Sequence, residues 1–235
     1  VSAVFERTGG NPLFITESVQ AMVASAVIAP EYGDYPAAVD SELPSAAEEI
    51  LARPVFLDNS PEAQKKRMEK GLDDIAFFAS QYFPDYFRDP FAKFHKEWDR
   101  IRTTKNEPIM VEAFRGAGKS TYFSMLDAVH AICYGRAHFM IFSSFEEDRS
   151  KMFTARILLE LLYNPRLKND FGEFISDFRP KAVGYFVADV PRQPGRTVAV
   201  KAVSIGQNVR GLVHGARRPD YARLDDIQSA KRAKS

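Results

Sequence analysis

The residues with the clearest chemical potential lie in the range 108–121, which reads Pro-Ile-Met-Val-Glu-Ala-Phe-Arg-Gly-Ala-Gly-Lys-Ser-Thr. A short apolar run precedes the glycines and an amphipathic segment follows them, an order that predicts strand, phosphate-binding loop and helix. Gly116 and Gly118 allow backbone N–H groups to close around phosphate oxygens. Lys119 can place its ammonium between the β- and γ-phosphates, and the Ser120 hydroxyl can ligate Mg²⁺.

The match to the common pattern G-x-x-x-x-G-K-[ST] is incomplete, because Ala113 stands where the first glycine is expected. An ordinary glycine-rich turn is the alternative interpretation. The apolar run before the loop and the amphipathic segment after it favour a nucleotide site. Arg115 adds a second cation, and the predicted helix N-terminus favours the negative charge of a phosphate.

Composition is ordinary for a globular chain: 235 residues, 45% hydrophobic and 27% charged. The single cysteine, Cys133, excludes an internal disulfide and fits a reducing compartment. Four histidines and one cysteine form no metal-ligand pattern. No apolar run is long enough to span a bilayer, so we expect no membrane association.

The net charge of +1 is unevenly distributed along the chain. Residues 1–50 carry eight acids against one arginine, whereas residues 191–235 carry ten Lys/Arg against three Asp. The basic end could face nucleic acid or nucleotide, or it could be a solvated surface.

We expect three parts: an acidic, loosely organised segment over residues 1–57, a helical and aromatic lead-in over 58–105, and an α/β core over 106–235. In the first part, residues 17–28 and 45–51 could be helices. In the second, Ser60 is a plausible N-cap for a helix over 61–83, and a helix over 94–102 follows an aromatic stretch. Those aromatic side chains could stack on a base or cover the core.

The core should alternate strands and helices. The pattern predicts a strand at residues 109–111, a helix ended by Gly135, a strand at 139–142, and a helix that Ser144 opens with a capping box and that ends before Pro165. Residues 185–190 and 197–203 should form a hairpin. The fold class is therefore α/β, with a mostly parallel sheet flanked by helices.

A phosphate loop needs a carboxylate at the end of a neighbouring strand. Asp225 is the candidate metal ligand, together with Ser120, and Asp226 is the candidate base or water-orienting group. Adjacent acids at a strand end are costly unless a cation joins them. Arg223 counts against this interpretation, because a charge inside a buried strand needs a partner; a surface Asp-Asp turn is the alternative.

With the phosphate loop and the Asp225-Asp226 pair taken together, the chain resembles the ATPase domain of phage terminase large subunits over residues 82–227. The matching stretches are Arg115-Gly116-Ala117-Gly118-Lys119-Ser120, the sequence of residues 89–95, Ser143-Ser144, and the stretches 206–211, 217–220 and 224–227. The family's loop is commonly Arg-x-x-Gly-Lys-[Ser/Thr] without the leading glycine, so Ala113 is then expected.

The resemblance implies a P-loop ATPase that uses ATP and Mg²⁺ to drive double-stranded DNA into viral capsids. It implies catalytic roles for Arg115, Lys119 and Asp226, and metal ligation by Ser120 and Asp225. The expected nucleotide contacts are Phe94, His95, Arg115, Gly116, Ala117, Gly118, Lys119, Ser120 and Thr121, with Phe94 or His95 near the adenine. Arg210 would belong to the loop before the metal strand, in contact with phosphate or DNA.

The resemblance also implies partners and a location: the portal, the small terminase subunit, a homo-oligomeric ring and the cytoplasm of the infected host cell. A coupling strand and a nuclease domain are expected after the metal-binding strand, and the sequence ends at Ser235. We therefore expect a truncated module that is weak in turnover, with a sheet that is incomplete at its C-terminal end. A helicase-like or kinase P-loop protein and a binding module without turnover remain alternatives.

Overall fold

The computed structural model describes residues 45–104, 108–145, 147–182, 184–204 and 211–225. The helix predicted over residues 17–28 lies outside them. The helical segments are α3 (Ser45–Leu51), α4 (Pro61–Asp73), α5 (Ile75–Tyr82), α6 (Lys93–Thr104), the π-helical η2 (Thr121–Leu126), α7 (Asp127–Cys133), α8 (Glu147–Tyr163) and α9 (Pro165–Phe171). The strands are β1 (Phe139–Ser144), β2 (Lys181–Ala182), β3 (Tyr185–Asp189), β4 (Thr197–Ser204) and β5 (Tyr221–Asp225).

The five strands form one mixed sheet in the order β2-β3-β4-β1-β5. β1 lies between β4 and β5 and is parallel to both. β3 is antiparallel to β4, and β2 is antiparallel to β3. The hairpin and the strand at 139–142 are confirmed. The prediction of a mostly parallel sheet was wrong, because the β3–β4 hairpin and β2 add as many antiparallel pairings as β1 makes parallel ones.

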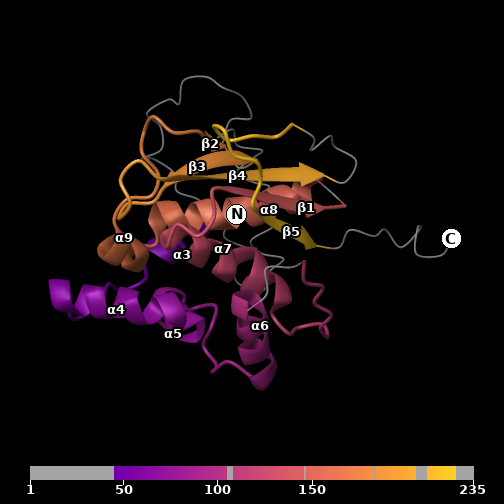
Figure 1. Cartoon of the computed structure of the whole chain (residues 1–235). Coiled ribbons are helices and arrows are strands. Elements are labelled where there is room, and N and C mark those ends of the chain that lie inside the picture. Colours follow the sequence, from indigo (N-terminus) through magenta and orange to yellow (C-terminus); the bar gives the residue numbers. More distant parts are fainter. Residues whose placement is uncertain (1–44, 105–107, 146, 183, 205–210, 226–235) are drawn as a thin grey trace.

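The labelled helices lie on one side of the sheet, with α7 and α8 nearer to it and α4, α5 and α6 farther away (Figure 1). One hydrophobic core joins these layers, from Met68 on α4 through Phe78 on α5 and Leu126 on η2 to Phe142 on β1. The helical lead-in is therefore packed into the same core as the sheet. No helix among the described residues is long and apolar enough to cross a bilayer.

The strand predicted at residues 109–111 is absent, which corrects the first element of the expected strand-loop-helix unit. Met110 is 89% exposed, and Ile109 and Phe114 are also exposed. An apolar run becomes a strand only where a neighbour accepts its backbone hydrogen bonds. Among the described strands, β5 is at the sheet edge and pairs with β1 alone, so this run has no partner there.

Two helix boundaries also differ from the expectation. The helix predicted over residues 61–83 is two helices, because Asp74 leaves the helical conformation and its side chain caps α5 by accepting from the Phe77 N–H at 2.8 Å. Ser144 does not open α8, since it is the last residue of β1. Ser60 does cap α4, through the Ala63 N–H, and Gly135 ends α7 at a φ of 62°.

Candidate functional site

The loop before η2 has the backbone conformation that a phosphate cradle needs. Gly116 and Gly118 have φ angles of 89° and 76°, a region that L side chains rarely adopt. A Cβ at Gly116 would meet nothing within 4 Å, so the space in front of this residue is open. Helical backbone begins at Lys119, so the N–H groups of the loop lie at a helix N-terminus.

Lys119, Ser120 and Asp225 converge, as the sequence analysis expected. The Ser120 hydroxyl donates to Asp225 Oδ2 at 3.0 Å, and Lys119 Nζ lies 3.9 Å from Asp225 Oδ1. Asp225 is 8% exposed and comes from the last position of β5, more than a hundred residues after the loop. The carboxylate, the hydroxyl and the ammonium therefore lie together, although they come from two segments that are distant in the sequence.

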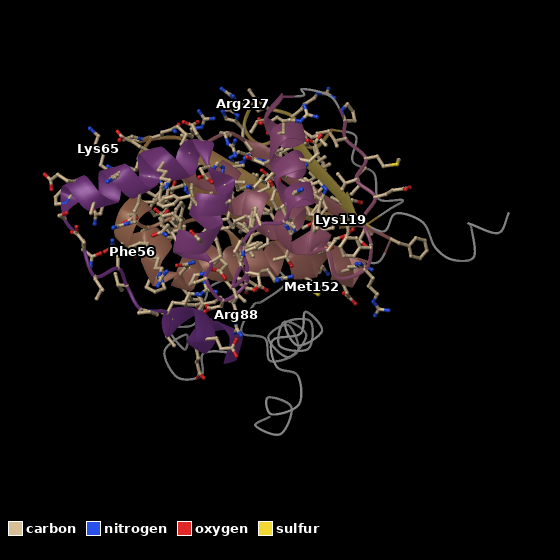
Figure 2. All side chains as sticks on the ribbon, turned by 90° about the horizontal axis from the view of Figure 1, so that it is seen from below. Phe56, Lys65, Arg88, Lys119, Met152 and Arg217 are labelled. Carbon is tan, nitrogen blue, oxygen red and sulfur yellow. The ribbon has the colours of Figure 1, made fainter. Side chains whose placement is uncertain are left out.

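Parallel pairing explains why Asp225 meets the loop. β1 is aligned with β5 so that Ser144 stands beside Asp225, at the carboxyl ends of both strands. In α/β sheets, ligand sites form outside the carboxyl ends of strands. Lys119 lies toward one end of the molecule, far from Lys65 and Phe56 at the other end (Figure 2).

The end of β1 and the start of α8 supply two residues near Asp225 that were not predicted to contribute to the site. An Arg149 guanidinium nitrogen lies 3.7 Å from Asp225 Oδ2. Ser144 is 1% exposed, and its hydroxyl has no hydrogen-bond partner in the part of the chain that the structure describes. The sequence did carry a signal for them. Ser144 and Arg149 follow the strand predicted at residues 139–142, and residues that follow a parallel strand lie at the carboxyl edge of the sheet, where ligand sites form.

His95 holds the loop from the side of α6. Its Nδ1 accepts from the Ala92 N–H at 3.1 Å, so the proton must sit on Nε2, which donates to the Ala117 carbonyl at 3.0 Å. Phe94 packs edge-on against Phe114 at 5.6 Å between ring centroids. Both residues predicted on the adenine side therefore contact the loop; their contact with a base stays a prediction.

Arg223 has a buried partner, which removes the objection to a charged residue in β5. Its guanidinium bonds to Asp127 on α7, and the Tyr221 hydroxyl donates to the same carboxylate at 2.9 Å. Arg102 approaches Asp127 from α6 at 3.1 Å. Burial raises the pKa of Asp127, but Arg223, Arg102 and Arg136 outweigh it and hold that pKa below its ordinary value.

Asp220 fixes the opposite end of β5 beside β1. Its carboxylate accepts from the His138 and Phe139 N–H groups at 3.0 Å each. Burial raises its pKa, but these backbone donors outweigh burial and hold the pKa below its ordinary value. Asp220 thus sets the alignment that brings Asp225 to the loop.

The remaining predicted residues are distributed as follows. Arg115 is exposed in the loop, Ala117 is buried there, and Thr121 is the first residue of η2. Asp226 and Arg210 lie outside the described residues. No group of three His, Cys, Asp or Glu side chains suited to a metal occurs among the described residues.

The residues present fit a magnesium-bound nucleoside triphosphate. Mg²⁺ takes few protein ligands, prefers oxygen, and usually keeps several waters and phosphate oxygens. Ser120 and Asp225 provide a hydroxyl and a carboxylate in contact with each other. The open backbone at Gly116 and the ammonium of Lys119 suit phosphate oxygens.

An open hollow of about 770 Å³ lies elsewhere, between the segment before α4 and α4 itself. Phe56 in its wall is covered by Arg67 and Arg166, whose guanidinium carbons lie 3.9 Å and 5.1 Å from the ring centroid. Arg67 is also paired with buried Asp170 at 2.8 Å. These arginines act in packing, and the hollow carries no functional conclusion.

Comparison of the chain with known protein families, with curated proteins and with solved structures gives no match. Evidence for function therefore comes from the geometry of the loop, of Asp225 and of the start of α8.

Proposed function

We propose that this chain is a P-loop ATPase that binds ATP and Mg²⁺ at residues 115–121 and Asp225. The observation that carries the proposal is the shared contact of Lys119 and Ser120 with the Asp225 carboxylate, at 3.9 Å and 3.0 Å. A chance glycine-rich turn would have no reason to face a buried carboxylate at the end of a parallel strand.

Each residue of the pocket has a role that its chemistry suits. Lys119 and Arg115 neutralise the triphosphate, and the backbone N–H groups of the loop bind its oxygens. Ser120 and Asp225 hold the metal, and Asp226 orients the attacking water. Mg²⁺, when bound, offsets charge on the phosphate oxygens. Catalysis then depends chiefly on positioning and on charge stabilisation.

The biological role that we propose is translocation of double-stranded viral DNA into capsids, as in the phage terminase large subunits that the sequence resembles. The portal, the small terminase subunit and other copies of the chain in a ring are the corresponding partners, in the cytoplasm of the infected host. The excess of basic over acidic residues between positions 191 and 235 supports a nucleic-acid partner, although Arg223 among them is paired with Asp127.

Calorimetry with ATP and Mg²⁺ tests the nucleotide site. Lys119→Ala should abolish measurable ATP binding, because it removes the ammonium that lies beside Asp225 and is proposed to neutralise the triphosphate. Lys65→Ala is the matched control: Lys65 is exposed, pairs only weakly with Glu69 at 3.7 Å, and lies at the other end of the molecule (Figure 2). ATP binding that survives Lys119→Ala contradicts the site.

Phosphate release tests turnover and the DNA role. Stimulation by double-stranded DNA, and not by small phosphate acceptors, supports a translocating motor over a helicase-like protein or a kinase. A nucleotide-binding module without turnover is the second candidate, and it is favoured by the lack of a strand at residues 109–111 within the part of the chain that the structure describes. Tight ATP binding without phosphate release would select that candidate.

A further inference from the structure

The start of α8 lies beside the proposed nucleotide site. Arg149 comes from the first turns of α8 and lies 3.7 Å from Asp225 Oδ2, while Lys119 lies 3.9 Å from Oδ1. The two cations therefore approach different oxygens of one carboxylate. The Arg149 side chain is 40% exposed, so its guanidinium is accessible to a ligand from solvent.

The backbone that carries Arg149 is firmly placed. The neighbouring Ser150 hydroxyl is buried and donates to the Val203 carbonyl of β4 at 2.8 Å. The start of α8 is thereby attached to the sheet one residue beyond Arg149. The long guanidinium side chain can change its partner while its Cα stays in place.

The charges around Asp225 give a reason for Arg149 to change its partner when a metal ion binds. One carboxylate accepts from Ser120 and has two cations beside it. A divalent cation on Asp225 would repel both, because like charges at such short distances are unfavourable. A triphosphate bound at the loop would offer anionic oxygens to both side chains, and guanidinium forms strong paired hydrogen bonds with phosphate.

We propose that Arg149 is a further triphosphate-binding residue, which pairs with Asp225 in the free chain and with the terminal phosphate when magnesium-bound ATP is present. This inference rests on the proposed nucleotide site. Ser144 supports it independently: its buried hydroxyl has no partner among the described residues and stands beside Asp225 in register. A buried hydroxyl without a protein partner is available to a water or a ligand beside Asp225.

The test compares ATP with ADP by calorimetry in the presence of Mg²⁺. Arg149→Gln should weaken ATP binding by about tenfold or more, since it removes a charge-assisted hydrogen bond. ADP binding should change by less than about threefold, because ADP lacks the terminal phosphate. Arg149→Lys keeps the positive charge but loses the planar guanidinium that can donate two parallel hydrogen bonds, so it should give an intermediate loss of ATP affinity.

Arg88→Gln is the matched control, an exposed arginine on the connection between α5 and α6. It should leave both affinities unchanged, and thermal unfolding checks that all variants fold. Wild-type ATP affinity in folded Arg149→Gln, or an equal loss for ATP and ADP, overturns this inference alone. A wild-type chain that binds neither nucleotide overturns the proposed function and this inference with it.

Discussion

Asp127 shows at the scale of one residue how a buried charge is made tolerable. Its carboxylate is contacted by Arg223 from β5, by Arg102 from α6 at 3.1 Å and by Arg136 at 4.0 Å. Three elements thus share one acid. A buried ion pair is expensive to break, because the remaining charge loses its compensation.

Replacing the shared acid should lower the free energy of unfolding more than replacing one of its arginines. Asp127→Asn leaves the arginines without their shared anion and should lower the free energy of unfolding by about 3 kcal/mol or more. Arg223→Met leaves Asp127 paired with Arg102 and should cost about 1–2 kcal/mol. Denaturant unfolding of both variants checks the order. An Arg223→Met chain less stable than Asp127→Asn would contradict it.

Arg223 also shows what residue-level reasoning from sequence misses. A charged residue in a buried strand argued against the Asp225 site, because no partner for it was identified. The partner, Asp127, lies on α7, 96 residues before Arg223 in the sequence, so this contact exists only in the folded arrangement. Arg149 was missed for the same reason, since its meeting with Asp225 depends on the pairing of β1 with β5.

At the scale of elements, short sequence patterns predicted the helix ends and the turn that depend on neighbouring residues alone. Ser60 caps α4, Gly135 ends α7, and the β3–β4 hairpin forms where turn residues separate two apolar runs. The run at 109–111 has the composition of a strand but lacks a paired neighbour among the described residues. Its outcome is set by long-range pairing, which composition does not encode.

The phosphate loop is the element whose conformation can be tested most directly. Gly116→Ala places a Cβ at a φ of 89°, and Gly195→Ala does the same at 79° in the β3–β4 turn. Neither Cβ would meet an atom within 4 Å, so the two changes differ only in location. Each should cost about 1–2 kcal/mol of stability from backbone strain.

Only the loop variant should affect ligand binding. Gly116→Ala distorts the N–H groups proposed to hold phosphate, so the ATP affinity measured by calorimetry should fall by about tenfold or more. Gly195→Ala should keep the wild-type affinity despite its equal loss of stability. Equal ATP affinities in the two variants would show that the loop does not form the site.

At the scale of the whole molecule, His130 joins the lead-in helices to the core beneath the sheet. Its Nε2 donates to the Gly71 carbonyl of α4 at 2.8 Å, and its Nδ1 accepts from Arg136. Both ring nitrogens are therefore used by the neutral imidazole. Burial, followed by the nearby Arg136 guanidinium, lowers the pKa of His130 to about 3.

This pKa predicts a loss of stability in mild acid. The unfolded chain takes up a proton on this histidine below about pH 6.5, whereas the folded chain does not until about pH 3. The unfolded state thus binds more protons across that window, and the free energy of unfolding falls as pH falls, by up to about 1.4 kcal/mol per pH unit. Asp127 adds a loss only below about pH 4, where its unfolded form becomes protonated.

Denaturant unfolding between about pH 7.5 and pH 4.5 measures the effect, which should reach about 2–3 kcal/mol from His130. His130→Gln removes the titrating group while its amide can still donate to the Gly71 carbonyl, so its stability should be nearly flat across this range. His214→Gln is the matched control: the pKa of His214 is also lowered, but this half-buried side chain should account for little of the decline. A decline that persists in His130→Gln and disappears in His214→Gln would place the acid sensitivity at the far end of the sheet, away from the contact between α4 and α7.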